Sequence, residues 1–314
     1  TNSEGNHGED VKEYYYYLDS TPTHSYMRYL YKYPLNAYPY EDLVATNRSR
    51  SRDEPEYELI DTGIFDANEY CDIEVEYAKA DTEDFLIQIT VHNRSDQQAQ
   101  LHLLPTLWFR NTWSQDGSVK PLITVATGES GASKLQASHL ELGDFELHCS
   151  GANQLVFTDN ETNTERIFQR PNESPYTKCG INRYLVHGET GAVNPAQQGT
   201  KAAAIYNLSM GAHAATIIKL RLSKTTPESR AEAAIKAFDQ ILAERKKDCD
   251  DFYAQVMPNG LGADQQLVFR QAMAGMLWSK QFYNYDIAPW LQQRGIDPLA
   301  SHGAQGFRNQ QWHH

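Results

Sequence analysis

The sequence predicts a mainly β protein with C-terminal helices, in which a large antiparallel β-sandwich precedes a helical segment. Short runs of alternating apolar and polar residues recur along most of the chain, and clusters of Gly, Asn, Asp and Ser separate them. No helix-period segment lies between these runs, which argues against parallel βαβ units. From residue 226 onward the apolar spacing becomes helical. We therefore expect a β-sandwich domain over residues 1–225 and helices over residues 226–314.

Alternation of side chains predicts the individual strands. Near the start, Tyr29, Tyr31 and Tyr33 alternate with other residues, which indicates a strand with one buried face. Residues 72–78 and 85–92 alternate equally clearly. Further strands are predicted at 100–110, 122–126, 145–149, 154–158, 202–208 and 215–222. A sheet that presents tyrosines can bind sugars, or it can use tyrosine simply as an amphipathic filler of a half-buried face.

Two helices are predicted after the strands. In the first, Thr226 is the expected N-cap and Pro227 the first helical residue. Its predicted buried face carries Ile235, Phe238, Leu242, Cys249, Phe252 and Val256. The second is expected from Asp264 to about Tyr285, and its central part is apolar on nearly all sides, so we expect it to be deeply buried. A buried helix needs companions around it, and the sequence predicts none after it, so we expect a truncated helical domain.

Composition narrows the classes of partner. Among the 314 residues there are 28 Lys and Arg against 41 Asp and Glu, a net charge of -13, which disfavours binding to nucleic acid. The mean hydropathy is -0.63, and no apolar run reaches the roughly 18 residues that a membrane helix needs. We therefore expect neither nucleic acid nor a membrane as a partner.

The four cysteines do not form a metal or redox motif. Cys71, Cys149, Cys179 and Cys249 are far apart, which predicts free thiols in a reducing compartment, and we expect a cytoplasmic protein. His7 lies beside two carboxylates, but no second cluster completes a metal site. No cofactor is expected, because the glycine fingerprints of nucleotide sites and the motifs of serine hydrolases are missing from the sequence.

Two groups of aromatic residues are candidates for a sugar site. Trp108 and Trp113 flank an Arg-Asn pair, and they could line a sugar or domain interface or belong to the edge of the core. At the end of the second helix, aromatics alternate with amide and basic side chains, which is the combination that sugar sites use. A later loop adds a similar group. The candidate substrate-binding residues are Trp278, Lys280, Gln281, Tyr283, Arg308 and Trp312. The alternative is helix-end packing beside a surface loop.

Several long stretches resemble bacterial glycoside hydrolases of family 63, the relatives of mannosyl-oligosaccharide glucosidase. They are residues 6–15, 18–26, 103–113 and 276–283, together with Arg308-Asn309, Trp312 and His313. The resemblance implies an N-terminal β-sandwich followed by an (α/α)6 barrel. On this basis the chain would hold most of the sandwich, without its first strands, and the first helices of an incomplete barrel.

The resemblance also implies an activity. Members of the family cleave terminal α-glucosidic or related bonds with inversion, and their catalytic acid and base would lie beyond His314, so no residue of this sequence is expected to be catalytic. The implied partners are an oligosaccharide substrate and the remainder of the same polypeptide. Two alternatives stay open, namely a sandwich that binds carbohydrate without cleaving it and a structural or interaction domain.

Overall fold

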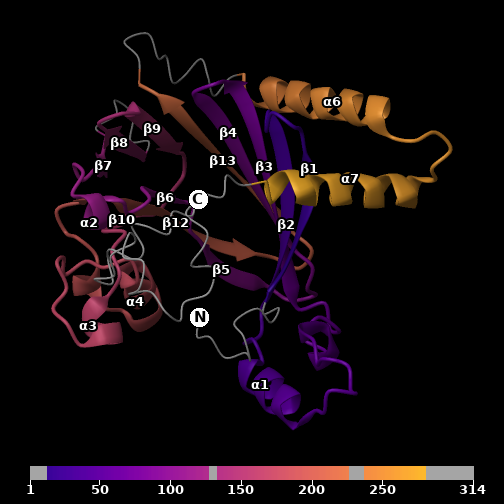
Figure 1. The fold of residues 1–314 in the computed structure, drawn as a ribbon, viewed down its shortest axis with the longest axis horizontal. Coiled ribbons are helices and arrows are strands. Elements are labelled where there is room, and N and C mark those ends of the chain that lie inside the picture. Colours follow the sequence, from indigo (N-terminus) through magenta and orange to yellow (C-terminus); the bar gives the residue numbers. More distant parts are fainter. Residues whose placement is uncertain (1–12, 127–132, 226–236, 281–314) are drawn as a thin grey trace, which may run out of the picture. The chain divides into compact units, whose positions relative to one another are not determined.

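The computed structural model describes residues 13–126, 133–225 and 237–280, and its core is two antiparallel β-sheets (Figure 1). The larger sheet has nine strands in the order β1-β2-β3-β4-β13-β9-β8-β7-β11. Their bounds are β1 Tyr14–Ser20, β2 Tyr26–Pro34, β3 Tyr70–Asp81, β4 Asp84–Asn93, β7 Leu122–Val125, β8 Lys134–His139, β9 Gly143–Cys149, β11 Gln198–Gly199 and β13 Ala215–Lys224. Every neighbouring pair in this sheet is antiparallel.

The smaller sheet is built around the long strand β12, Lys201–Met210. Strand β10, Gln154–Thr158, pairs with one edge of β12. Strands β5, Ala99–Leu103, and β6, Thr106–Trp108, pair with its other edge, one after the other. The smaller sheet thus has fewer strands than the larger sheet.

The main hydrophobic core lies between the two sheets. It contains alternate residues of both sheets, for example Ile73, Val91 and Leu220 from the larger one and Phe157 and Ala204 from the smaller one. This arrangement follows from the period of two along a strand, which sends every second side chain to the same face.

Two long helices cover the outer face of the larger sheet. Helix α6 spans Phe238–Val256 and helix α7 spans Ala263–Trp278. Phe238, Leu242 and Tyr253 of α6 form a second core with outward-facing sheet residues such as Tyr26 and Leu86, and α7 adds partly buried side chains to it. These helices are therefore attached to the face opposite the main core.

Shorter helices lie in the connections. They are α1 Tyr40–Ser49, η1 Leu59–Thr62, α2 Trp113–Asp116, α3 Thr164–Phe168, α4 Gly180–His187 and η2 Thr190–Ala192. Helix α4 packs on the outer face of the smaller sheet, where Ile181 contacts Val156, Ala203 and Ile205. Both sheets thus have helices on their outer faces.

The prediction of a mainly β fold, an antiparallel sandwich with C-terminal helices, is confirmed. One predicted strand, 100–110, is wrong in detail, because it is divided into β5 and β6 at Leu104-Pro105. Proline has no N–H to give to a sheet ladder, although the Pro105 carbonyl still accepts from Ala204 N–H at 3.0 Å. Strand β8 and helices α1 and α4 were not expected from the sequence.

The second helix is predicted to be buried by companion helices that the sequence itself does not supply, and α7 is largely exposed in the described residues, so its burial stays a prediction. In α7 only Ala274 is buried, while Leu267, Val268 and Met276 are exposed, the last by 73%. The helix is held on one side, where Phe269 and Met273 meet the second core. The expected start of the preceding helix at Thr226 and Pro227 lies outside the described residues.

The chain separates into two compact units, Thr1–Leu277 and Trp278–His314, and both sheets and α6 belong to the first. The predicted division after residue 225 stays a prediction. Within the described ranges, the helices are all too short or too polar to cross a bilayer.

Candidate functional site

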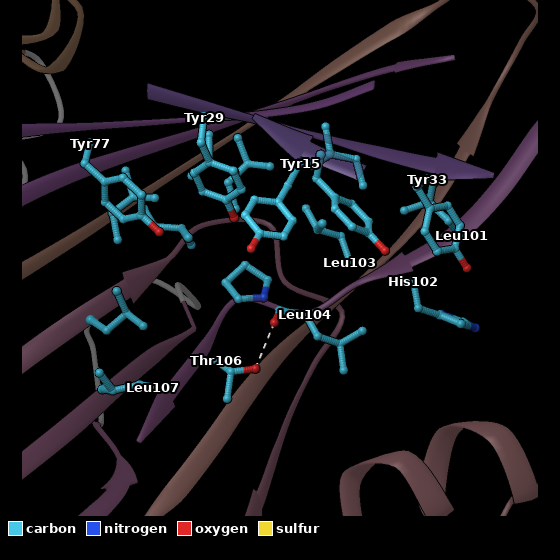
Figure 2. A pocket seen from close by; sticks show the side chains of 18 of the residues that line it. Tyr15, Tyr29, Tyr33, Tyr77, Leu101, His102, Leu103, Leu104, Thr106 and Leu107 are labelled. Carbon is cyan, nitrogen blue, oxygen red and sulfur yellow. Dashed lines mark hydrogen bonds between the residues drawn. The ribbon is translucent and has the colours of Figure 1, made fainter. Parts of the chain in front are cut away.

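A cavity of about 620 Å³ opens between the two sheets and is lined mainly by apolar and aromatic residues (Figure 2). Strands β1 to β4, β13 and β9 of the larger sheet form one wall and part of the floor. The segment 101–107, which contains β5 and the start of β6, forms the other wall. The volume lies within the usual range for small-molecule sites, roughly 300–1,000 Å³.

Tyrosines dominate the wall formed by the larger sheet. Tyr15 comes from β1, Tyr29, Tyr31 and Tyr33 come from β2, and Tyr77 comes from β3. The register explains this gathering, because Tyr15 lies opposite Tyr31 on the neighbouring strand, and residues two apart on one strand share a face. Figure 2 shows the hydroxyl ends of four of these side chains directed toward the gap between the sheets.

The opposite wall is an unbroken run of residues. All seven residues from Leu101 to Leu107 line the cavity, so both faces of this segment contribute. Among the described strands, β5 is the last of its sheet, and its second edge has no strand beside it. At the break in this segment, the Thr106 hydroxyl donates to the Leu104 carbonyl at 2.8 Å. The cavity therefore opens along the edge of the smaller sheet.

A further set of aromatic rings extends the tyrosine wall. The hydroxyls of Tyr31 and Tyr38 are 3.1 Å apart, and the ring of Tyr38 is stacked on that of Tyr40 with centroids 5.4 Å apart. Glu13, the one carboxylate that the described residues place in the lining, lies near this set, and its charge helps to raise the pKa of Tyr38, where burial is the larger cause. A stacked pair of rings therefore lies behind Tyr31, whose own ring lines the cavity.

Two buried phenols of the wall, Tyr31 and Tyr77, are neutral over the physiological range. Burial raises the pKa of Tyr31 to about 12, and burial together with the nearby Tyr29 raises the pKa of Tyr77 to about 12. A neutral phenol can both donate and accept a hydrogen bond. The wall therefore offers ring faces and hydroxyl groups, while the floor, with residues such as Ile89 and Leu220, is purely apolar.

The cavity is suited to binding. Inverting hydrolysis needs two carboxyl groups at roughly 6.5–9.5 Å, one as acid and one as base. Among the described residues, the lining supplies one carboxylate, Glu13. Nor does any group of three His, Cys, Asp or Glu in the described ranges have the arrangement of a metal site.

A second polar cluster lies near the small sheet and has a structural explanation. The Lys120 ammonium is 2.8 Å from Glu161 and 3.2 Å from Asp159, and the Trp113 indole N–H donates to Glu161 at 3.1 Å. Glu161 is thus a buried carboxylate with two donors, as buried charges require.

The two tryptophans that the sequence analysis considered together differ in exposure. Trp113 is buried beside Glu161, whereas Trp108 on β6 is 55% exposed. The core-edge interpretation therefore fits Trp113.

Of the six predicted substrate-binding residues, two are described. Trp278 is the last residue of α7, and Lys280 follows two residues later with an exposed side chain. Gln281, Tyr283, Arg308 and Trp312 lie outside the described residues. The grouping of the six therefore stays a prediction.

The cavity itself was only partly foreseen. The alternation of Tyr29, Tyr31 and Tyr33 predicts a tyrosine face, and the interpretation of that face as a sugar surface or as core filler was left open. Tyr15 and Tyr77 were not assigned to it, because their position depends on strand register. The leucine-rich segment 101–107 cannot be recognised as a cavity wall from its sequence, because a cavity wall and a buried strand have the same composition.

One relative identified by sequence is an uncharacterized protein of Saccharomyces cerevisiae. The two sequences are 35% identical over 357 residues. The match covers 100% of this chain and 33% of the yeast protein. The chain therefore spans about a third of the length of the relative that it matches. No protein-family model matches the chain.

Two solved structures show distant similarity. One is a putative kojibiose phosphorylase from the human microbiome, at 10% identity and a TM-score of 0.29, which covers 71% of this chain and 24% of that protein. The other is a polysaccharide lyase, at 9% identity and a TM-score of 0.29, which covers 51% of this chain and 21% of that protein. Both TM-scores are too low to assign a function to this chain.

Proposed function

We propose that the chain is part of a carbohydrate-processing enzyme, more specifically of an inverting, exo-acting glycoside hydrolase of the α-glucosidase kind that acts on oligosaccharides. The observation that carries the carbohydrate part of this proposal is the tyrosine wall of the cavity, in which five phenols from three adjacent strands share one face. Aromatic rings with hydroxyl groups suit sugars, whose rings have apolar faces and polar edges.

The hydrolytic part of the proposal is supported by the long sequence stretches that resemble family 63 glycoside hydrolases and by the order of a sandwich followed by helices. In this proposal the described part is not the place of bond cleavage. Of the described residues that line the cavity, one is a carboxylate, Glu13, and an inverting reaction needs two. The sandwich then binds or positions carbohydrate, and the catalytic pair lies elsewhere in the polypeptide.

The decisive experiment compares two preparations. The 314-residue chain and the longest polypeptide that its gene encodes are assayed with maltose, kojibiose and nigerose, and the anomer released first is read by proton NMR. We expect hydrolysis with release of β-glucose by the longer polypeptide and none by the 314-residue chain. Hydrolysis by the 314-residue chain would mean that a catalytic carboxylate pair lies within it. No hydrolysis by either preparation would overturn the glycosidase proposal.

A second candidate, a non-catalytic carbohydrate-binding sandwich, is favoured by the same lining. It predicts saccharide binding without turnover by any form of the polypeptide. The absence of hydrolysis by the longer form, combined with binding, would select it.

A further inference from the structure

The tyrosine wall has three chemical properties that restrict its ligand. Its buried phenols Tyr31 and Tyr77 are uncharged, since burial raises the pKa of each to about 12. Its rings present flat apolar faces, and its hydroxyl ends are directed toward the gap (Figure 2). An ionic ligand would gain little from such a wall, and a hydrocarbon would leave the hydroxyls without a partner once water is displaced.

The opposite wall and further polar residues complete this pattern. Leu101, Leu103 and Leu107 supply an apolar surface across from the phenols. Glu13, His102 and Thr106 add polar groups to the lining, and the His102 ring nitrogen Nδ1 is 2.7 Å from the Asn207 side chain. A ligand in this space meets apolar surface on two sides and hydrogen-bonding groups along its edges.

We propose that this cavity is a binding site for a neutral oligosaccharide, with the ring of Tyr15 as its outer stacking platform and Tyr33 as a second one. A pyranose has apolar C–H faces that fit between phenol rings and leucines, and equatorial hydroxyls that reach phenol and carboxylate oxygens. The exposure of Tyr15 and Tyr33, at 55% and 37%, leaves ring surface that a ligand can cover. This inference deepens the proposed function, because it assigns carbohydrate recognition to a site separate from bond cleavage.

An extended peptide is the competing occupant. The edge of β5 that none of the described strands covers could accept a strand through main-chain hydrogen bonds. Strand addition, however, draws on the backbone of 101–103 and gives no role to the phenol hydroxyls of β1 and β2. The saccharide accounts for both walls, and we therefore favour it.

The test uses the 314-residue chain and maltotriose as the probe, with binding followed by isothermal titration calorimetry and saturation-transfer NMR. The variants are Tyr15→Ala and Tyr33→Ala, and the matched control is Tyr16→Ala, since Tyr16 is the next residue of β1, is 40% exposed and faces the opposite side of the sheet. We expect each cavity variant to bind at least about fivefold more weakly, as for loss of an aromatic anchor, and the control to bind within about twofold of the unchanged chain.

Circular dichroism on each variant shows whether the fold is retained, and the exposure of Tyr15 makes its truncation tolerable. No detectable binding of maltotriose at millimolar concentration overturns the inference and leaves strand addition at β5 as the use of this face. Equal weakening in the Tyr16 variant also overturns it. A failure of the proposed hydrolase function would appear in the turnover assay of the longer polypeptide, whereas a failure of this inference would appear in maltotriose binding. The two failures are therefore distinguishable.

Discussion

The Arg270 guanidinium of α7 forms a bidentate ion pair with the Asp19 carboxylate of β1, with N–O distances of 2.5 and 3.2 Å. The same guanidinium donates to Asp250 of α6 at 2.7 Å and lies over the Tyr253 ring at 4.7 Å. Cys249 donates its thiol hydrogen to the same Asp19 carboxylate at 3.3 Å. One arginine therefore joins both C-terminal helices to the outer face of the larger sheet.

The first prediction concerns this ion pair. Arg270→Ala takes the guanidinium away from the Asp19 carboxylate, whose side chain is only 10% exposed, and removing one partner of a buried pair typically costs about 3–5 kcal/mol. We expect the free energy of unfolding, measured by urea titration, to fall by an amount of this order.

The control for this pair is Lys247→Ala, which breaks an exposed pair with Asp251 on α6 and should cost less than about 1 kcal/mol. Equal effects of the two substitutions would contradict a central role for Arg270. Arg270→Lys should restore only part of the loss, because an ammonium cannot make the bidentate contact.

The second prediction concerns Gly180, the first residue of α4. A Cβ atom there would lie 2.2 Å from the Ala192 carbonyl oxygen of η2 and 3.0 Å from the Thr158 methyl group. Since the backbone of η2 would have to move, Gly180→Ala should lower the free energy of unfolding by about 2 kcal/mol or more. Gly191→Ala, in η2 itself, has no atom within 4 Å of the new Cβ and should change stability by less than about 0.5 kcal/mol. A Gly180 variant as stable as the Gly191 variant would show that α4 and η2 are not so closely packed.

The fold was largely predictable because strands leave a local signal. Alternation at 72–78 and 85–92 is produced by one buried face, and the structure has β3 and β4 there. Strand β8 was missed because polar residues alternate with small apolar ones in it, so its period is weak. For α7 the sequence predicts burial among helices that it does not itself supply, and the described residues show only the side on which Phe269 and Met273 meet the second core.

The cavity was less predictable than the strands that form it. The alternation of Tyr29 and Tyr31 fixes which residues of β2 share a face, but the pairing of Tyr15 with Tyr31 depends on the register between β1 and β2. The distance between the walls depends on how two sheets pack, and no local pattern encodes it. The prediction that Trp278 and Lys280 bind substrate rests on residue type alone.

The third prediction concerns the reactivity of the four thiols. Burial raises the pKa of Cys71 to about 11 and those of Cys149 and Cys249 to about 12. Cys179 differs, since burial raises its pKa but hydrogen bonds from Thr177 and Asn163 and the charge of Arg183 lower it by more.

Because the thiolate is the reactive form, iodoacetamide at pH 7.5 should modify Cys179 of the folded chain first. Peptide mass spectrometry over a time course measures this order, and Cys179→Ser should leave a chain that reacts slowly until it is unfolded. Earlier modification of Cys71 or Cys149 would contradict the described packing of the main core, in which both are buried.

The last prediction concerns pH. His148 on β9 lies between two cations on the neighbouring strands, opposite Arg221 of β13 and Lys134 of β8. Burial lowers its pKa from the ordinary 6.5, and Lys134 and Arg221 lower it further, against the opposing effect of Glu146 at 3.4 Å. The unfolded chain therefore takes up a proton on this imidazole at a higher pH than the folded chain does.

It follows that the contribution of His148 to stability is present above about pH 6.5 and is lost as the pH falls below that value. Urea titrations at pH 7.5 and 5.5 measure the change, and the fall in the free energy of unfolding should be smaller in His148→Gln, which has no such proton to bind. Other groups titrate in the same range in both proteins, so the difference between the two pH slopes isolates this imidazole. Identical slopes would mean that the two neighbouring cations do not act on His148 in the folded chain.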